Sequence, residues 1–186
     1  MESENMEFDM APVVDRQLVE WIRSIRRTLH QYPELSFQEH RTSLFIQEKL
    51  TELGISYRNG WAGTGVIATL GCSSGQLPCS GHVGLRADMD ALPIQDRKNV
   101  AYASKIPGVT HACGHDGHTA MLLGAAKYLA ETRNFDGTVV VIFQPAEEGG
   151  GGGRVMVDEG MMDRFGIDEV YGMHNWPGLP TGQFAI

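Results

Sequence analysis

The run TVVVIF at residues 138–143 limits the fold of this chain more than any other stretch. It holds six consecutive β-forming residues, and Pro145 stops it two positions later. An unbroken apolar run of this length predicts a strand covered on both faces, because a strand with one wet face alternates apolar and polar residues. Such a strand needs other elements on both sides of its sheet. The run therefore predicts a layered α/β fold.

Helical and strand patterns alternate around this run. Apolar residues spaced three or four apart, together with good helix formers, predict helices at residues 18–29, 39–53, 116–133 and 154–162. Short β-forming segments between turn residues predict strands at residues 55–58, 65–70, 82–86 and 169–173. The alternation predicts a three-layer α/β/α sandwich with a mainly parallel central sheet.

Length and charge narrow the classes of protein to consider. At 186 residues the chain suits one domain. Residues 1–12 are acidic and offer little to bury, so we expect a disordered arm ahead of a domain over residues 13–186. The net charge is −8, and no dense basic cluster interrupts it, which argues against a nucleic-acid partner.

Membrane and secretion signals are missing from the sequence. No apolar run approaches the roughly 18 residues that span a bilayer, and the N-terminus lacks the basic and apolar regions of a secretory signal. The three cysteines, Cys72, Cys79 and Cys113, are too few and odd in number for a disulfide framework. We therefore expect a cytoplasmic protein with no membrane partner, and a local disulfide between Cys72 and Cys79 stays an alternative.

Residues 111–118, HACGHDGH, gather three histidines, a thiol and a carboxylate at the start of the third predicted helix. Thiolate sulfur and imidazole nitrogen both bind zinc-like ions, at roughly 2.3 and 2.0 Å. Cys113 and His115 are separated by one residue, and the neighbouring glycines let the backbone fold tightly enough for both to reach one or two ions. The alternative is a helix-start loop with surface histidines and a buried thiol, but the density of ligands favours a metal site.

The adjacent carboxylates Glu147 and Glu148 directly follow the buried strand. Like charges repel, so the pair either lies on a surface loop or serves a purpose. Beside a metal, one carboxylate can coordinate the ion while the other takes a proton from water. His174 follows the last predicted strand and should emerge at the same edge of the sheet. A core histidine bonded to a backbone carbonyl is the alternative for His174.

The stretch LRADMDALP places Asp88 and Asp90 after another predicted strand. Each carboxylate could ligate a metal, orient a ligating imidazole or cap a turn before Pro93, and for Asp88 we favour the orienting role. Arg86 could offset the local negative charge or hold a substrate carboxylate. The sequence does not decide between these roles for Arg86.

Two other kinds of active site fit this sequence less well than a metal site. The five glycines at 149–153 are not followed by Lys-Ser/Thr, so they do not form a phosphate loop. Cys113 as a redox or nucleophilic cysteine is a further alternative, although its neighbours suit metal ligation better.

Four stretches together resemble a family of metal-dependent amidohydrolases, which includes N-acyl-amino-acid, hippurate and auxin amino-acid conjugate hydrolases. The stretches are LRADMDALPIQ, HACGHDGHTAMLLGAA, FDGTVVVIFQPAEEGGGG and GMHNWPGLPTG, and the earlier LHQYPELSFQEHRTS is similar too. The resemblance covers about residues 17–186. It implies a zinc-peptidase-like fold and a small N-acyl amino acid as substrate.

The resemblance also assigns roles to residues. It implies two divalent ions (Zn, Mn, Co or Ni) bound by Cys113, His115, Glu148 and His174. Glu147 matches the general base, which takes a proton from the attacking water and later protonates the leaving amine. We add Asp88 to the catalytic residues. The products would be a carboxylic acid and a free amino acid.

Members of this family are longer, with a smaller domain inserted into the catalytic domain. This chain stops at GQFAI, about where that insertion begins, so we expect an incomplete, N-terminal portion of the catalytic domain without the last histidine ligand. An open sheet edge and exposed apolar surface should follow. We expect marginal stability, aggregation or association into a homo-oligomer, and weak or absent turnover. The alternative function is a truncated, catalytically inactive metal-binding fragment.

Overall fold

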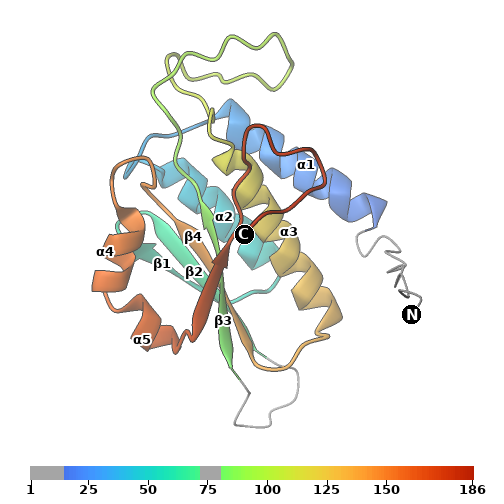
Figure 1. The fold of residues 1–186 in the computed structure, drawn as a ribbon, viewed down its shortest axis with the longest axis vertical. Helices are drawn as coiled ribbons and strands as arrows, with labels where there is room; N and C mark the ends of the chain where they lie inside the picture. The colour runs from blue at the N-terminus through green and yellow to red at the C-terminus, as the bar shows by residue number, and fades with distance from the viewer. Residues whose placement is uncertain (1–14, 72–80) are drawn as a thin grey trace, which may run out of the picture.

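The computed structural model of the protein describes residues 15–71 and 81–186 (Figure 1). Along the chain the elements are α1 (Arg16–Gln31), α2 (His40–Glu52), β1 (Tyr57–Trp61), β2 (Gly65–Gly71), β3 (His82–Asp88), α3 (His115–Thr132), β4 (Thr138–Gln144), α4 (Gly152–Asp158), α5 (Met161–Phe165) and β5 (Glu169–Gly172). The expected arm at residues 1–12 and the pair Cys72 and Cys79 lie outside the described residues.

The strands form one mixed sheet in the order β1-β2-β4-β3-β5. β3 runs parallel to both β4 and β5, whereas β2 pairs antiparallel with β1 and β4. The α/β class is confirmed, but the sheet is more mixed than a mainly parallel sheet, because β2 runs against the other described strands. Only residues 62–64 separate β1 from β2, and so short a connection can join only antiparallel strands.

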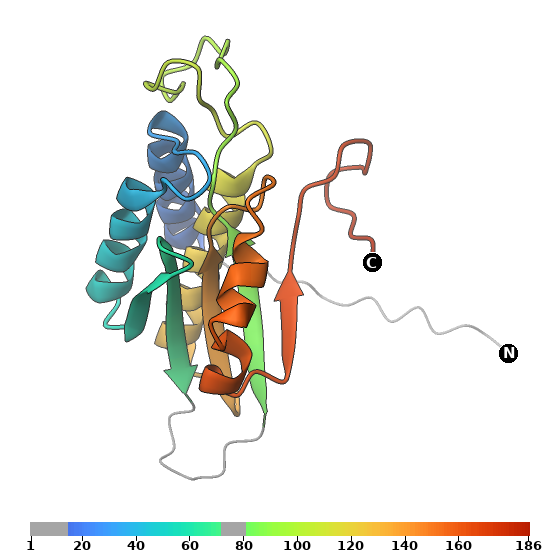
Figure 2. The same ribbon diagram turned by 90° about the vertical axis from the view of Figure 1, so that its left-hand side faces the viewer.

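Two apolar cores lie on the two faces of the sheet. Side chains of β4 alternate between them, with Val141 and Phe143 on one face and Val140 and Ile142 on the other. The first core includes residues of α1, α2 and α3, and the second includes Met156 of α4 and Met161 of α5. Figure 2 shows the sheet from the side, with α1 and α2 to its left. The layers of the predicted sandwich are therefore present, and TVVVIF is the strand covered on both faces.

Two predicted elements differ in extent from the observed ones. The helix expected at 154–162 is interrupted at Gly160, whose backbone is left-handed with φ 85°. Because an α-helix cannot continue through a left-handed residue, the segment forms the two short helices α4 and α5. The first predicted strand starts two residues later than expected, at Tyr57, and continues to Trp61.

The last strand leaves one edge of the sheet open. All four residues of β5 are exposed, and large apolar side chains beyond it are exposed as well, including Trp176 and Phe184. This agrees with the expected open edge and apolar surface. Within residues 15–71 and 81–186, no helix combines the length and apolar character needed to cross a membrane.

The packing of α2 gives a direct test of the core. Leu50 is fully buried, whereas Leu44 on the same helix is 59% exposed. Leu50→Ala should lower the free energy of unfolding by about 2–5 kcal/mol, because it removes buried apolar area and leaves a cavity. Leu44→Ala should change it by less than about 0.5 kcal/mol. Urea denaturation of both variants measures the difference, and equal losses would show that α2 does not pack as described.

Candidate metal centre

The candidate site lies where three strand ends meet the start of a helix. The parallel strands β3, β4 and β5 end at Asp88, Gln144 and Gly172, so their carboxyl ends share one edge of the sheet. The loops that follow these strands carry Glu147, Glu148 and His174, and α3 begins at His115. Residues far apart in the sequence thereby reach one small region.

Cys113, His115 and Glu148 form one group of metal-capable side chains. One ligand atom from each of them lies within 4.8 Å of the others. His115 Nε2 and Glu148 Oε1 are 3.8 Å apart, and both atoms are buried without a hydrogen-bond partner among the described residues. Buried polar atoms are nearly always paired. A soft thiolate, an imidazole and a carboxylate are suited to zinc-like ions, so a divalent cation fits this group.

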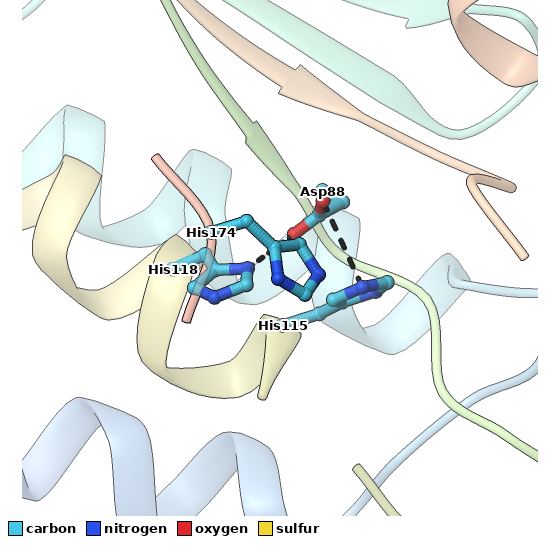
Figure 3. A group of neighbouring side chains, drawn as sticks. All are labelled: Asp88, His115, His118 and His174. Atoms are coloured by element: carbon cyan, nitrogen blue, oxygen red, sulfur yellow. Dashed lines mark hydrogen bonds and ion pairs between the residues drawn. The ribbon is translucent and has the colours of Figure 1, made fainter. Parts of the chain in front are cut away.

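A second group shares His115 with the first. Asp88, His115, His118 and His174 also place one ligand atom each within 4.8 Å of one another (Figure 3). The two groups are adjacent, since His174 Nε2 lies 3.4 Å from Cys113 Sγ. This arrangement offers donor sets for two neighbouring cations. Five of the six predicted site residues belong to these two groups. The sixth, Glu147, lies at the rim, with its Oε2 3.9 Å from His115 Nε2.

His115 is oriented as a ligand by its other ring nitrogen. The side chain is fully buried, and Nδ1 lies 2.9 Å from the backbone oxygen of Asp90. A carbonyl oxygen can only accept, so Nδ1 donates to it, and the neutral ring presents a lone pair at Nε2. Burial disfavours the imidazolium, but the hydrogen bond to Asp90 and the charge of Asp88 outweigh it and raise the pKa of His115.

The Cys113 thiol needs a cation to ionise. The pKa of this thiol is raised to about 12, mainly by burial. The hydrogen bond to Glu148 and the negative charges of Glu148, Glu147 and Asp88 raise it further. A thiol in this setting is a poor nucleophile at neutral pH. A divalent ion would reverse this balance, because metal coordination deprotonates a thiol. The electrostatics thus favour metal ligation over the nucleophilic cysteine considered from the sequence.

Asp88, a buried member of the second group, is paired with the partly buried Arg86. Asp88 is 1% exposed, and its Oδ2 accepts from Arg86 Nη1 at 2.9 Å. Arg86 Nε also donates to Gln144 Oε1 at 2.8 Å. Because these bonds occupy the guanidinium, we favour the role in which Arg86 offsets the negative charge of Asp88 over the role of holding a substrate carboxylate. Burial opposes ionisation of Asp88, but the hydrogen bond to His118 and nearby positive charges lower its pKa.

His118 and Asn175 also belong to the site, although the sequence motifs did not single them out. His118 Nδ1 lies 2.7 Å from Asp88 Oδ1, and its Nε2 lies 2.7 Å from Asn175 Oδ1. Asn175 fits there because Gly114 has no side chain: a Cβ at Gly114 would lie 2.2 Å from Asn175 Oδ1. The i, i+3 spacing of His115 and His118 on one helix was a signal that could have identified His118.

Asp90 contacts the loop that carries Glu147 and Glu148 and belongs to neither metal-capable group. It accepts hydrogen bonds from the backbone N–H groups of Glu147 and Glu148 and from Ser36. Burial opposes its ionisation, yet these bonds and the one with His115 lower the pKa of Asp90. Of the roles considered from the sequence, the position of Asp90 favours an orienting role over direct ligation.

Comparison with known proteins identifies relatives with named activities. An IAA-amino acid hydrolase (ILR1-like 5) of Arabidopsis thaliana is 47% identical over 167 residues, which cover 89% of this chain and 37% of that protein. The hippurate hydrolase of Campylobacter jejuni is 46% identical over 153 residues, covering 82% of this chain and 39% of the relative. The chain thus spans well under half the length of these relatives.

A solved structure and a family model point to the same family as these relatives. The crystal structure of the Bacillus subtilis protein YxeP, described as a dinuclear metal-binding peptidase of the M20 family, superimposes with a TM-score of 0.83 at 42% identity. The superposition covers 90% of this chain and 46% of that one. The family model described as peptidase family M20/M25/M40 matches residues 84–186, which is more than half of the chain. The chain therefore belongs to peptidase family M20/M25/M40.

Proposed function

We propose that this chain carries the metal centre of a hydrolase that cleaves the amide bond of N-acyl amino acids. The observation that carries the proposal is the group of Cys113, His115 and Glu148, with Glu147 beside it: two buried ligand atoms of this group have no hydrogen-bond partner in the part of the chain that the structure describes. The names of two relatives, a hippurate hydrolase and an IAA-amino acid hydrolase, support a substrate in which an acyl group is joined to an amino acid.

The proposed ligands are Cys113, His115, Glu148 and His174, and Asp88 in the second group is a further carboxylate beside them. Divalent ions held there would polarise the substrate carbonyl and lower the pKa of a water molecule. Asp88 also binds His118, which in turn contacts Asn175 beside His174. We assign Asp88 and His118 the task of holding the His174 loop against the start of α3.

The different exposure of Glu147 and Glu148 suits them to different roles. Both side chains place an oxygen within 3.9 Å of His115 Nε2, but the Glu148 side chain is 23% exposed and the Glu147 side chain is 40% exposed. A proton shuttle needs contact with both water and substrate, which suits the more open Glu147. In this role Glu147 accepts a proton from the attacking water and donates it to the leaving nitrogen.

A hydrolysis assay with controlled metal content tests this function. The protein is stripped with a chelator, reloaded with Zn²⁺, Mn²⁺ or Co²⁺, and incubated with hippurate or an N-acetyl amino acid. The expected result is release of free amino acid that requires the added metal. Release that is unaffected by chelation would contradict a metal hydrolase.

A second candidate is a metal-binding chain without turnover, and the exposed β5 edge favours it. The same assay separates the two functions. Bound metal with no release of amino acid from any substrate would favour this candidate, because the metal centre would then form without an effective active site.

A further inference from the structure

We propose that Glu39 and Asp90 are positioning residues that hold the backbone of the loop carrying Glu147 and Glu148. This inference rests on the proposed function of these two glutamates. Neither carboxylate is assigned as a metal ligand or as the general base. We call the pair Glu39 and Asp90 the carboxylate clamp.

Three consecutive backbone amides point at the clamp. The N–H of Ala146 donates to Glu39 Oε1 at 2.9 Å. The N–H groups of Glu147 and Glu148 donate to Asp90 Oδ1 at 3.0 Å and Oδ2 at 3.1 Å. Charge-assisted hydrogen bonds of this kind are stronger than neutral ones. Three in a row fix the path of the backbone from which both glutamate side chains project.

Both carboxylates are buried, and burial of a carboxylate costs free energy because its water is lost. Glu39 is 0% exposed and Asp90 is 1% exposed. A buried carboxylate destabilises a protein unless hydrogen bonds compensate for the lost water. Glu39 has the Ala146 amide and the Thr64 hydroxyl, whose Oγ1 lies 2.7 Å from Glu39 Oε2. Burial nevertheless raises the pKa of Glu39. An apolar residue would fill this space without the free-energy cost of burying a carboxyl group. The contact with the Ala146 amide gives a reason for a glutamate at this position.

The loop has a conformation that requires outside support. Ala146 has φ 53°, in the left-handed region that residues with a Cβ seldom adopt. The turn is also crowded, since a Cβ on Gly152 would lie 1.8 Å from the Pro145 carbonyl oxygen. Strained backbone persists when the surroundings determine it and is common at functional sites. Glu39 binds the amide of the strained residue itself.

Asp90 connects this loop to the imidazole ligand. The backbone oxygen of Asp90 accepts from His115 Nδ1, and Asp90 Oδ1 lies 3.3 Å from the same nitrogen. The hydroxyl of Ser36 donates to Asp90 Oδ2 at 2.7 Å and supports the carboxylate from the α1–α2 connection. One residue thus sets the position of His115 and of the two glutamates relative to each other.

The two clamp residues should respond differently to the same isosteric amide replacement. In Glu39→Gln the new side-chain oxygen can accept from Ala146, and its NH₂ can donate to Thr64, whose hydroxyl can turn to accept. In Asp90→Asn a single oxygen replaces two, so at least one of the Glu147 and Glu148 amides faces a donor instead of an acceptor. Glu39→Gln should therefore behave like wild type, and Asp90→Asn should not.

Zinc affinity, measured by competition with a chelator, tests the consequence for the metal centre. We expect Asp90→Asn and Glu39→Met to weaken zinc binding by about 10–100-fold, the usual effect of removing a group that orients a ligand. Glu39→Gln should stay within about threefold of wild type. The matched controls are Thr64→Val and Ser36→Ala, which remove a hydroxyl contact of each carboxylate but leave the backbone amides, and the contact of Asp90 with His115, in place. If these controls weaken zinc binding as much as the clamp variants do, the effect is general destabilisation and the proposal is overturned.

Hydrogen–deuterium exchange separates this proposal from the proposed function, because it needs neither metal nor substrate. The amides of Ala146, Glu147 and Glu148 should be protected in the wild-type protein. Protection of Glu147 or Glu148 should be lost in Asp90→Asn, and that of Ala146 in Glu39→Met but not in Glu39→Gln. Unprotected amides in the folded wild type would overturn the clamp even if the protein binds zinc and hydrolyses substrate. Protected amides that respond as expected would uphold it even if turnover is absent.

Discussion

Glu147→Gln should lower kcat for hydrolysis of an N-acyl amino acid by about 10²–10⁴-fold, the usual contribution of a positioned general base. The amide side chain has the same shape but cannot take a proton from water. Zinc binding should stay near the wild-type level, because Glu147 is the more exposed of the two glutamates and Glu148 is the one grouped with Cys113 and His115. Steady-state kinetics of metal-loaded protein, with zinc content measured in parallel, gives both quantities.

The neighbouring glutamate supplies the matched control for this experiment. Glu148→Gln makes the same chemical change one residue later, and we expect it to reduce bound zinc as well as turnover. The two variants therefore separate proton transfer from ligation. Equal turnover in wild type and Glu147→Gln would contradict the base assignment, and loss of zinc in Glu147→Gln would make Glu147 a ligand instead.

Cys113→Ser should weaken zinc binding by more than about 100-fold, since it exchanges a thiolate ligand for a hydroxyl that does not ionise near neutral pH. A Co²⁺-loaded protein should also lose its sulfur-to-metal charge-transfer absorption. Chelator competition measures the first effect and absorption spectroscopy the second. Unchanged zinc affinity with an unchanged cobalt spectrum would remove Cys113 from the ligand set.

The pH dependence of zinc affinity gives a second readout of the thiol. The pKa of the metal-free Cys113 thiol is raised to about 12, so the thiol is protonated below that pH and must release its proton when zinc binds. Apparent zinc affinity should therefore rise with pH, by up to about tenfold per unit for this one proton. Cys113→Ser should release about one proton fewer per ion, which calorimetry in buffers of different ionisation enthalpy detects. An equal number of released protons in both proteins would show that the thiol stays protonated.

The sequence predicted those parts of the protein that depend on local patterns. The unbroken run 138–143 correctly predicted a doubly covered strand, and the helices α1, α2 and α3 follow from apolar spacing and from good helix formers. The mixed character of the sheet was missed, because the direction of β2 depends on the three-residue connection 62–64. Gly63 in this connection was an available signal, because a loop of three to five residues that contains glycine is typical of a hairpin.

The metal-capable residues were predictable because several ligand types occur close together in short motifs. The carboxylate clamp was not, since Glu39 and Ala146 are 107 positions apart. Glu39 reads as an ordinary residue at the start of a polar-rich helix, and only the folded structure shows that it is buried against the loop. The i, i+3 spacing of His115 and His118 was visible in the sequence, but the contact of His118 with Asn175, 57 positions away, was not.

The central claim is that Cys113, His115, Glu148 and His174 share bound cations at the carboxyl edge of the sheet. Anomalous diffraction at the zinc edge, from crystals grown with Zn²⁺, tests it most directly. The account predicts peaks at roughly 2.3 Å from Cys113 Sγ and roughly 2.0–2.2 Å from His115 Nε2 and a Glu148 oxygen, with His174 coordinating an ion in the same cluster. A map without zinc among these side chains, or with zinc only at other surface residues, would contradict it.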